Sequence, residues 1–531
     1  MAAQDWSALA GVDLSPWESS PEQQLVARHW RSLARFHRQR YAEALADAEA
    51  VWRHQPENPA YLNLYAVLLK KTGQLVPAID CFRQGIQRFP AVADLHYNLG
   101  NALRELEDYG AAVSAYRQAL ALRPDHSETH HNLGSTLRDL HRGEEALPHL
   151  ERAHQLDPDN PEICQNLATT LMGLNRFAEA RTWVHKALDR KGSFAPLPRP
   201  ATPHEQAVRH SLALLSDHHE ALFNLSLCYL SEGDLRRGFA AYDARLPIPG
   251  KAPNPVGTPI ASALPRPGQG PLLIWSEQGF GDILQFSRYL IWLQQLGHEV
   301  WFATRPLLLP LFREGFDLPS ERLLADGDPR IREFSCHLPL MTLPSLFATE
   351  LATIPLPGNY LRPPFKGPQL DLPPLLRVGV CWASGRENRD LYADKSMVAA
   401  TLLEPLLPAC RAEDLCLVSL QVGEDAPQLE PFRSEPNLFD PAPALTSFAD
   451  TAAVIAQLDL VITVDTAVAH LAGAMGKPTW VLLPFNADWR WLTERRDSPW
   501  YPSMRLYRQP RPGDWAAILA AVTRDLQAVL G

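Results

Sequence analysis

The chain has 531 residues, which is more than one hydrophobic core usually serves, so at least two domains are expected. Its formal net charge of −10 argues against an overall basic surface for nucleic acid or for an anionic membrane. Hydrophobic residues make up 46% and charged residues 21%, a mixture typical of a globular protein rather than a disordered one.

The sequence shows no pattern typical of a signal peptide, a membrane-spanning helix or a zinc site. The N-terminal residues lack the apolar run of a signal peptide, and no later window of about 18 residues is apolar enough to span a membrane. The seven cysteines never form C-x-x-C, which argues against a zinc cluster or a disulfide framework. Asp326 and Asp328 form a D-x-D pair, but they lie in a polar turn. We therefore expect a cytoplasmic protein that uses no metal or other cofactor and inserts into no membrane.

Residues 26–190, which follow an N-terminal segment (1–25), repeat with a period of 34 residues. Small residues and closing prolines keep this spacing, at Ala44, Ala78, Ala112, Ala146 and Ala180 and at Pro56, Pro90, Pro124 and Pro158. Small residues let the two helices of a hairpin approach closely, and proline ends the second helix. The pattern resembles the tetratricopeptide repeat and predicts a helical solenoid.

Four asparagines occupy one position of the repeat: Asn98, Asn132, Asn166 and Asn224. A column of side-chain amides on the concave face can donate to and accept from an extended peptide backbone. These asparagines are therefore candidate acceptor-binding residues for a protein or peptide in the groove. The alternative interpretation is that each amide bonds between neighbouring helices and holds the array together.

The repeat array is interrupted before the second half of the chain. Residues 191–217 combine a Pro-rich stretch with a predicted helix, and residues 218–246 restore one final repeat-like unit. Residues 247–271 are again rich in proline, which favours a semi-rigid linker and excludes a helix. We expect the domain boundary in this linker.

From residue 271 onward, short apolar strands alternate with helices. Strands are predicted at 271–275, 298–304, 337–340, 377–383, 415–421, 460–465 and 479–484. Such alternation is typical of parallel sheets, and a Pro-rich crossover divides the series into two Rossmann-like lobes, 272–365 and 376–531. The predicted fold class is therefore α plus α/β. Because ligands bind beyond the carboxyl ends of such strands, the residues after each strand are the candidate site.

The first candidate segment, residues 277–282, follows the first of these strands. Gln278, Gly279 and Gly281 form a predicted tight turn that presents backbone N–H groups at the start of a helix. Asp282 lies where a carboxylate can take a proton from an acceptor hydroxyl. An acidic residue in a first turn also favours the helix dipole, so base and cap are two open interpretations.

The second candidate segment, residues 465–470, closes the predicted strand 460–465. Asp465 and Thr466 are N-cap residues for the next helix, whose free N–H groups, from Ala467 onward, suit a phosphate or diphosphate. His470, one turn into the helix, is a further candidate donor. The alternative is an ordinary cap followed by a buried histidine.

The third candidate segment is the polar loop after the strand 377–383. Ser384 and Gly385 begin it, residues 386–390 are mostly charged, and Lys395 follows. A cation in this loop can stabilise a leaving phosphate. The alternative is a solvated loop.

These segments together resemble one family. WSEQGFGDILQFSRYL at 275–290, SLQ at 419–421 and the blocks 447–484 and 488–509 are similar to bacterial tetratricopeptide-repeat glycosyltransferases. The catalytic half of that family is similar to the lipopolysaccharide heptosyltransferases, and its architecture is similar to protein O-GlcNAc transferase. The resemblance implies a GT-B fold and inverting, metal-independent transfer from a nucleotide-activated sugar.

The resemblance also implies roles for individual residues. Asp282 matches the position of the base, and Lys395 matches a lysine that contacts phosphate. Asp465, Thr466 and His470 match the diphosphate loop, in which Ala467-Val468 replaces the usual Gly-Pro. Positions beside the nucleotide base and ribose are matched by Gln421, Asp450 and Thr451, and the acceptor side of the cleft by His337.

The expected function is transfer of a sugar to Ser or Thr of a protein acceptor held by the repeats. Flagellin or another surface protein is the acceptor that the resemblance implies. Asp282 deprotonates the hydroxyl in this scheme, and Lys395 and His470 stabilise the departing phosphate. Two alternatives are a heptosyltransferase-like enzyme acting on a glycan or lipid, with the repeats serving assembly into an oligomer, and a non-catalytic repeat scaffold.

Overall fold

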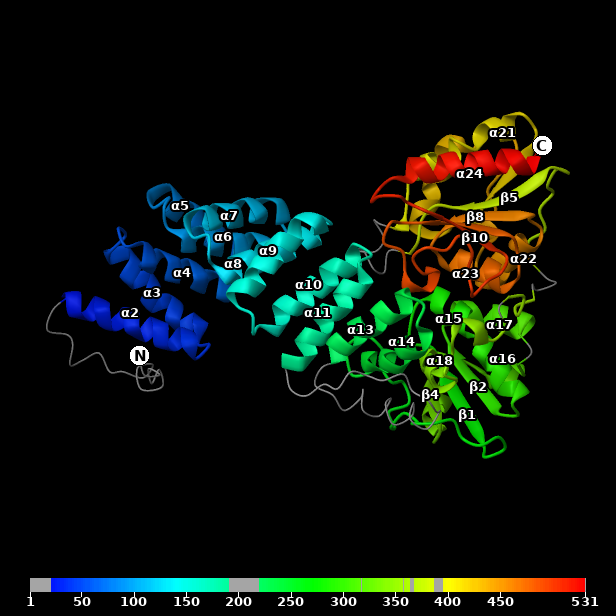
Figure 1. Ribbon diagram of the computed structural model, residues 1–531, viewed down its shortest axis with the longest axis horizontal. Coiled ribbons are helices and arrows are strands. Elements are labelled where there is room, and N and C mark those ends of the chain that lie inside the picture. Colours follow the sequence, from blue (N-terminus) through cyan, green and yellow to red (C-terminus); the bar gives the residue numbers. More distant parts are fainter. Residues whose placement is uncertain are drawn as a thin grey trace. The chain divides into compact units, whose positions relative to one another are not determined.

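The computed structural model describes residues 21–190, 219–316, 318–356, 358–362, 367–385 and 395–530 (Figure 1). Contacts divide the chain into two compact units, Met1–Ser193 and Phe194–Gly531. Across the described ranges, no helix combines the length and the apolar character needed to cross a bilayer. The predicted insertion, residues 191–217, lies outside the described residues.

The first unit is a solenoid of helical hairpins, which confirms the prediction from the 34-residue period. Its helices are α2 (Pro21–His37), α3 (Tyr41–His54), α4 (Pro59–Lys71), α5 (Leu75–Arg88), α6 (Ala93–Glu105), α7 (Tyr109–Leu122), α8 (Ser127–Asp139), α9 (Gly143–Leu156), α10 (Pro161–Gly173) and α11 (Phe177–Arg190). A Cβ atom on Gly100 would lie 2.5 Å from the ring of Tyr116, so only glycine allows this close approach of α6 and α7.

The turn inside each hairpin also follows the repeat. A left-handed backbone conformation recurs every 34 residues, at Gln39, Gly73, Glu107, His141 and Asn175, with φ between 58° and 81°. Glycine occupies only one of these turns, so the other four hold side chains in a conformation that they rarely adopt. This periodic backbone feature was not evident from the residue types.

The last repeat-like unit is part of the core of the second unit. It forms α13 (His219–Ser231), α14 (Leu235–Tyr242) and a short 3-10 turn (Asp243–Arg245). Phe239 packs edge-to-face against Phe286, Trp489 and Trp500 at centroid distances of 6.1, 5.6 and 6.5 Å. The structural division therefore falls at Ser193, whereas the sequence analysis set the boundary in the linker 247–271.

The second unit contains a four-stranded parallel sheet in the order β3-β2-β1-β4. Its strands are β1 (Pro271–Trp275), β2 (Glu299–Thr304), β3 (Leu323–Ala325) and β4 (His337–Pro339). The associated helices are α15 (Phe280–Phe286), α16 (Arg288–Gln295), α17 (Leu309–Gly315) and α18 (Leu343–Leu346). Leu273 of β1 lies opposite Trp301 of β2 and His337 of β4, which places β1 inside the sheet.

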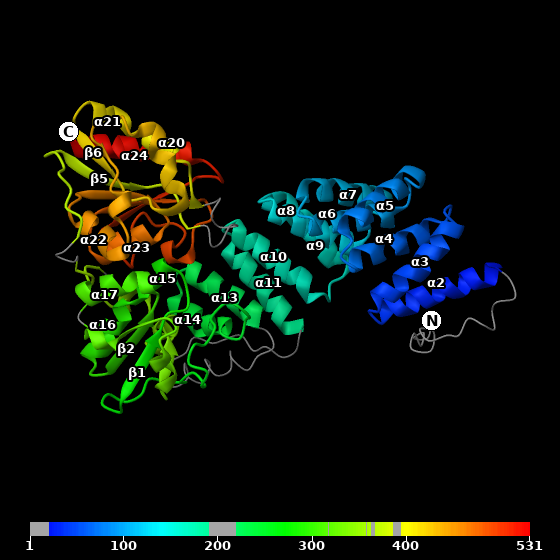
Figure 2. The same ribbon diagram turned by 180° about the vertical axis from the view of Figure 1, so that it is seen from behind.

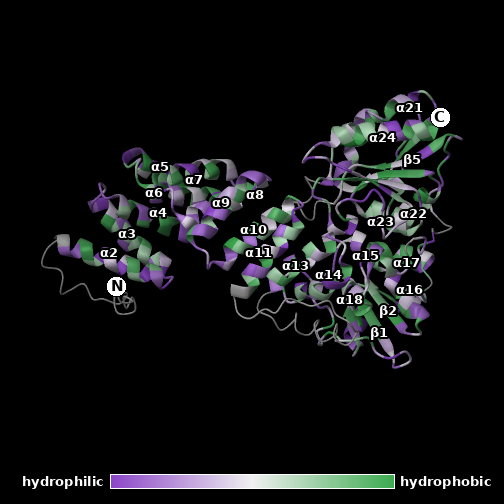
Figure 3. Cartoon of the chain, viewed as in Figure 1, coloured by the Kyte–Doolittle hydropathy of each residue, from purple (hydrophilic) through white to green (hydrophobic). Residues whose placement is uncertain are grey.

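A six-stranded parallel sheet follows, in the order β10-β9-β8-β5-β6-β7. Its strands are β5 (Leu376–Cys381), β6 (Leu415–Ser419), β7 (Leu438–Phe439), β8 (Leu460–Val464), β9 (Thr479–Leu483) and β10 (Met504–Arg508), and its helices are α20 (Ala399–Leu403), α21 (Leu407–Arg411), α22 (Phe448–Ala456), α23 (Ala467–Ala474) and α24 (Trp515–Leu530). The inner strands β5 and β8 are almost wholly apolar, as the green ribbon of β5 shows in Figure 3. The strand order reverses between β5 and β8, which leaves a crevice beyond their carboxyl ends.

Helices α15 and α23 bring the two sheets together. They lie side by side in both ribbon views (Figures 1 and 2), and they make close contacts along their length. Each follows directly after the carboxyl end of a strand, β1 for α15 and β8 for α23. The parallel sheets predicted from the sequence are thus confirmed, and their strand ends face a common region.

Candidate active site

The turn after β1 positions Asp282. This residue lies in the first turn of α15, and its Oδ2 accepts the Gly279 backbone N–H at 3.1 Å. The carboxylate therefore caps its own helix, as one of the two interpretations held, while its side chain remains 21% exposed. At Gly281 a Cβ atom would lie 2.7 Å from the His470 ring, so glycine is required for α15 to meet α23.

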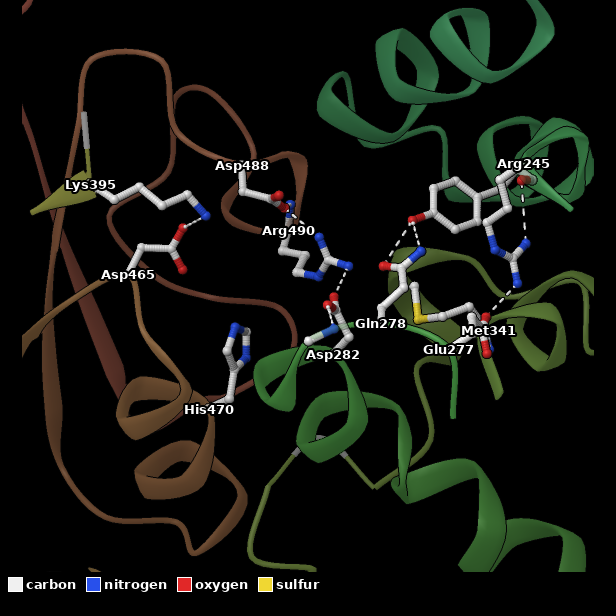
Figure 4. Close-up of polar contacts among 12 residues, drawn as sticks. Arg245, Glu277, Gln278, Asp282, Met341, Lys395, Asp465, His470, Asp488 and Arg490 are labelled. Atoms are coloured by element: carbon white, nitrogen blue, oxygen red, sulfur yellow. Dashed lines mark hydrogen bonds and ion pairs between the residues drawn. The ribbon is translucent and has the colours of Figure 1, made fainter. Parts of the chain in front are cut away.

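An arginine that the sequence analysis did not assign contacts Asp282. Arg490 lies in a 3-10 turn after β9 (Trp489–Trp491), and it forms an ion pair with Asp282 through Nη2 (Figure 4). Its Nη1 donates to Asp488 Oδ1 at 2.7 Å. The guanidinium also lies 4.3 Å from the centre of the Trp489 ring. Only 8% of the Arg490 side chain is exposed, so the ion pair joins the two halves of the second unit in a nearly dry setting.

For each of the two aspartates, burial raises the pKa of the carboxyl and the Arg490 charge lowers it. Burial raises the pKa of Asp282, and the Arg490 charge opposes this shift without cancelling it. Burial also disfavours the ionised form of Asp488, but Arg490 and Lys395 outweigh it and lower the pKa of Asp488 to about 2. Asp488 is therefore a fixed anion, whereas Asp282 is the more basic of the two carboxylates.

Lys395 pairs with Asp465 on the side of β8. The distance from Lys395 Nζ to Asp465 Oδ2 is 2.7 Å (Figure 4). Burial disfavours the ammonium, yet Asp465 and Asp488 outweigh this effect and raise the pKa of Lys395. The predicted loop residues 386–390 lie outside the described residues, but the lysine that follows them reaches the cluster.

His470 is buried and uncharged. Burial lowers the pKa of its ring to about 3, because the nearby carboxylates do not offset the loss of solvation. Its Nδ1 lies 3.1 Å from the Tyr501 hydroxyl, and the ring stacks on Trp491 at a centroid distance of 5.2 Å. His470 can therefore donate or accept a hydrogen bond in this cluster, but it does not supply a positive charge.

A cavity of about 940 Å³ adjoins this charged cluster. It lies beyond the carboxyl ends of β5, β6 and β8 and is closed on one side by Phe280 and Leu307 of the four-stranded half. Six of the predicted donor-binding residues line it: Ser384, Gly385, Gln421, Thr451, Thr466 and Ala467. Phe280 stands two residues before Asp282, and Thr466 directly follows Asp465, so the cavity lies next to the cluster, although the charged residues of the cluster do not line it.

Two predicted donor-binding residues are engaged in local structure. Gln421 Oε1 accepts the backbone N–H groups of Trp382 and Ala383 at 3.2 and 2.9 Å, which shapes the turn after β5. Asp450 accepts from the backbone N–H groups of Thr446 and Ser447 at the start of α22. Gln421 also faces the cavity, whereas Asp450 serves as a helix cap.

His337 lies away from the cleft, contrary to the sequence-based expectation. Its side chain is fully buried at the start of β4. Nδ1 accepts from Trp275 Nε1 at 3.2 Å, and Nε2 lies 3.0 Å from the Thr258 hydroxyl. Both ring nitrogens therefore hold the chain around β1.

A buried ionic network supports the turn that carries Asp282. Arg245 pairs with Asp243 and with Glu277, each at 2.6 Å, and all three side chains have no exposed surface. The next residue, Gln278, bonds to the Tyr242 hydroxyl at 3.0 Å. Tyr242, Asp243 and Arg245 come from the last repeat-like unit, so that unit holds the turn after β1 in place. The sequence analysis missed this network, because nothing in the repeat pattern marks a buried arginine.

The asparagine column of the first unit is occupied by contacts between repeats. Asn98 donates to Asn63 at 2.9 Å, and Asn132 donates to Asn101 at 2.9 Å. Asn166 donates to Ser135 at 3.2 Å. These contacts match the interpretation that the amides hold neighbouring helices together. Asn224 lies on α13 in the second unit.

Among the described residues, no group of three or more His, Cys, Asp or Glu side chains could hold a metal ion. Asp328 of the D-x-D pair is bound to Arg330 at 2.7 Å. Lys395 and Arg490 are the cations of the charged cluster beside the cavity.

The comparisons with known proteins agree with this division of the chain. Residues 93–126 and 137–193 match tetratricopeptide repeat families, and residues 442–482 match glycosyltransferase family 9 (heptosyltransferase). The chain therefore carries tetratricopeptide repeats and a segment that is similar to glycosyltransferase family 9. That segment runs to β9 and contains α22, β8 and α23, including Asp465 and His470.

Similar proteins cover only part of the chain. Protein FlbA of Caulobacter vibrioides is 27% identical over 283 residues, which are 48% of this chain and 46% of FlbA, so the match spans less than half of that relative. MamA 41-end from Desulfovibrio magneticus RS-1 is 19% identical and covers 32% of this chain and 95% of its own, with a TM-score of 0.30. YrrB, described as a TPR protein with an unusual peptide-binding site, is 18% identical. The match covers 38% of this chain and 93% of YrrB, with a TM-score of 0.31.

Proposed function

We propose that the protein is a glycosyltransferase of GT-B arrangement that moves a sugar from a nucleoside-diphosphate sugar to Ser or Thr of a protein acceptor. The observation that carries the proposal is the cavity of about 940 Å³ beside Asp282, Lys395 and Arg490. A deep cavity beyond the ends of β5, β6 and β8 suits a nucleotide. The adjacent cluster combines a basic carboxylate with cations, which are the groups that transfer from a diphosphate requires.

The donor is bound with its diphosphate at the start of α23. Ala467 and Val468, the first two residues of α23, line the cavity there, and a helix N-terminus favours an anion. Lys395 lies beside this helix start through its pair with Asp465. Together these groups offset the diphosphate charge, so we propose transfer that needs no metal ion.

The transfer is a single displacement with inversion. Asp282 takes the proton of the acceptor hydroxyl, and the oxygen forms a bond to the anomeric carbon. The bond from that carbon to the diphosphate oxygen breaks, and the nucleoside diphosphate leaves with the electron pair. Lys395 and the start of α23 stabilise the charge that develops on it. The raised pKa of Asp282 suits it to accept the proton.

The repeat unit supports a protein or peptide acceptor, because helical repeat arrays bind extended chains on their concave surface. A glycan or lipid acceptor is the second candidate, favoured by the family 9 segment.

The decisive experiment incubates the full chain with a panel of nucleoside-diphosphate sugars and candidate acceptors. Intact mass spectrometry should detect one added sugar on a protein, and the same yield is expected in EDTA. A sugar added only to a glycan would select the second candidate. No binding of any nucleoside diphosphate would contradict the glycosyltransferase function and leave a repeat scaffold.

A further inference from the structure

Arg490 forms an ion pair with Asp282, the proposed general base, so Asp282 must be released from this pair before it accepts a proton from the acceptor hydroxyl. We propose that Arg490 exchanges partners during the reaction: without donor it holds Asp282, and when the donor diphosphate binds it moves to the diphosphate and frees the base. This inference rests on the glycosyltransferase function proposed above. It assigns to Arg490 a part in donor binding and makes donor binding precede deprotonation of the acceptor.

The geometry of Arg490 fits a side chain with one permanent and one exchangeable partner. Asp488 lies two residues away on the same turn and binds Nη1 at 2.7 Å. Asp282 comes from the other half of the unit, 208 residues away, and binds Nη2. Within the described residues Arg490 Nε is buried and has no hydrogen-bond partner. The guanidinium can therefore gain an acceptor at Nε when it leaves Asp282, without losing Asp488.

The turn beneath Arg490 is anchored independently of Asp282. Arg508 of β10 donates to the Trp491 carbonyl, and the Trp491 ring stacks on His470. Trp489 lies against Phe239 and Trp500 in the apolar core. Loss of the Asp282 contact therefore leaves the backbone of the turn in place, and the exchange requires movement of the side chain alone.

Charge favours the exchange when a diphosphate is present. The cluster contains two cations, Lys395 and Arg490, and three carboxylates, Asp282, Asp465 and Asp488. Asp488 interacts with both cations, so a diphosphate at Lys395 lies within electrostatic reach of Arg490. A diphosphate has more charge and more acceptor oxygens than one carboxylate, and arginine binds phosphate in a bidentate manner.

The same exchange makes Asp282 a better base. A carboxylate paired with arginine binds a proton weakly, because the positive charge stabilises its ionised form. Removal of Arg490 leaves burial as the dominant influence on Asp282, and burial raises its pKa further. An acceptor hydroxyl is therefore activated only after the donor is in place, which protects the base from unproductive contacts.

The test measures nucleoside diphosphate binding to the full chain, with ADP, GDP and UDP titrated separately. Binding is followed by calorimetry and by the change in tryptophan fluorescence of the chain, to which Trp489 and Trp491 beside Arg490 contribute. Asp282→Asn should tighten binding by at least threefold, because it removes the competitor for Arg490. Arg490→Gln should weaken binding by about tenfold or more, since hydrogen bonds to charged groups contribute on that scale. In the double variant, the tightening caused by Asp282→Asn should disappear.

A matched control and the contrary results make the test decisive. Arg505→Gln removes an exposed arginine of β10 that pairs with Asp525, and it should leave the Kd unchanged. Arg490→Lys retains the charge if the glutamine variant fails to fold, and Asp282→Asn leaves Arg490 paired with Asp488. Unchanged or weaker binding by Asp282→Asn overturns the exchange while the proposed function stands. If the wild-type chain binds no nucleoside diphosphate, both proposals fail.

Discussion

Polar residues serve different purposes in the repeat array and in the charged cluster of the second unit. In the array, each asparagine contacts a residue about one repeat away, as in the bond of 2.9 Å between Asn98 and Asn63. In the cluster, Arg490 and Asp282 meet across 208 residues, and Arg490 Nε is left without a partner among the described residues. The periodic contacts hold neighbouring repeats together, whereas the contact in the cluster joins two segments far apart in the sequence and leaves one buried donor atom unpaired.

If Asp282 were only a helix cap, the charged cluster would be structural, as the asparagine contacts of the repeat array are. Asp282→Asn keeps an oxygen that can accept the Gly279 N–H, so the cap survives while the basic carboxylate is lost. We expect kcat to fall by about 10²–10⁴-fold, which is the usual contribution of a general base. Transfer rates by mass spectrometry and thermal unfolding of the variant check this expectation. Near wild-type turnover would show that Asp282 serves only to cap α15.

The repeat side of the comparison is tested by removing the asparagine column. Asn98→Ala, Asn132→Ala and Asn166→Ala together should lower the free energy of unfolding of the first unit by at least about 1.5–4.5 kcal/mol, counting about 0.5–1.5 kcal/mol for a single hydrogen bond of each asparagine. Chemical denaturation of the full chain measures this change. Gln84→Ala with Gln118→Ala, at exposed positions one repeat apart, is the control and should have little effect.

A different outcome would favour peptide binding by the same residues. If the triple variant unfolds like the wild type but no longer modifies its protein acceptor, the amides contact the acceptor rather than one another. Donor binding should be unchanged in either case, because no residue of the column lines the cavity beside Asp282.

Periodic and apolar features could be predicted from the sequence, because they depend on local physical constraints. The spacing of Ala78, Ala112 and Ala146 sets the approach of paired helices, and these residues are fully buried as expected. The seven apolar runs became β1, β2, β4, β5, β6, β8 and β9. The strands that were missed are short, as β3 and β7 are, or lie at a sheet edge and include arginines that are not buried, as β10 does.

The site was only partly predictable, because its contacts depend on the tertiary fold. Ser384, Thr451 and Thr466 follow or flank strands, and such positions reach the crevice in any parallel sheet. Arg490 could have been found only as an Asp-x-Arg pattern beyond β9, since its partner Asp282 is remote in sequence. His337 was wrongly assigned to the cleft, because it is the first residue of β4 and its side chain is turned inward to accept a hydrogen bond from Trp275.

The pH dependence of folding stability tests whether the His470 ring is shielded from solvent in the cluster. Its ring has a pKa of about 3 in the folded chain and about 6.5 when unfolded, so below pH 6.5 only the unfolded state takes up this proton. Folding stability is therefore lost as pH falls from about 6.5 toward 3. His470→Gln should reduce the loss between pH 7.5 and 5, measured by denaturation at each pH. Equal losses in wild type and variant would show that the ring is solvated.

Exposed His54 of the repeat array supplies the control for this measurement. His54→Gln removes one imidazole from an exposed position and is measured at the same pH values. The difference between the two variants isolates the contribution of the cluster.

The smallest expected effect concerns the last repeat-like unit, which contacts the turn that carries Asp282. Tyr242→Phe removes the hydroxyl that bonds to Gln278 at 3.0 Å and leaves the ring in the core. A hydrogen bond of about 0.5–1.5 kcal/mol predicts a fall in kcat of about two- to tenfold with little change in donor KM. Tyr507→Phe, which removes a bond of 3.0 Å to Asp525 outside the site, should leave kcat unchanged. Both substitutions remove one hydrogen bond, but only Tyr242→Phe acts on the turn after β1. Equal effects of the two variants on kcat would therefore mean that the last repeat-like unit stabilises the fold without positioning Asp282.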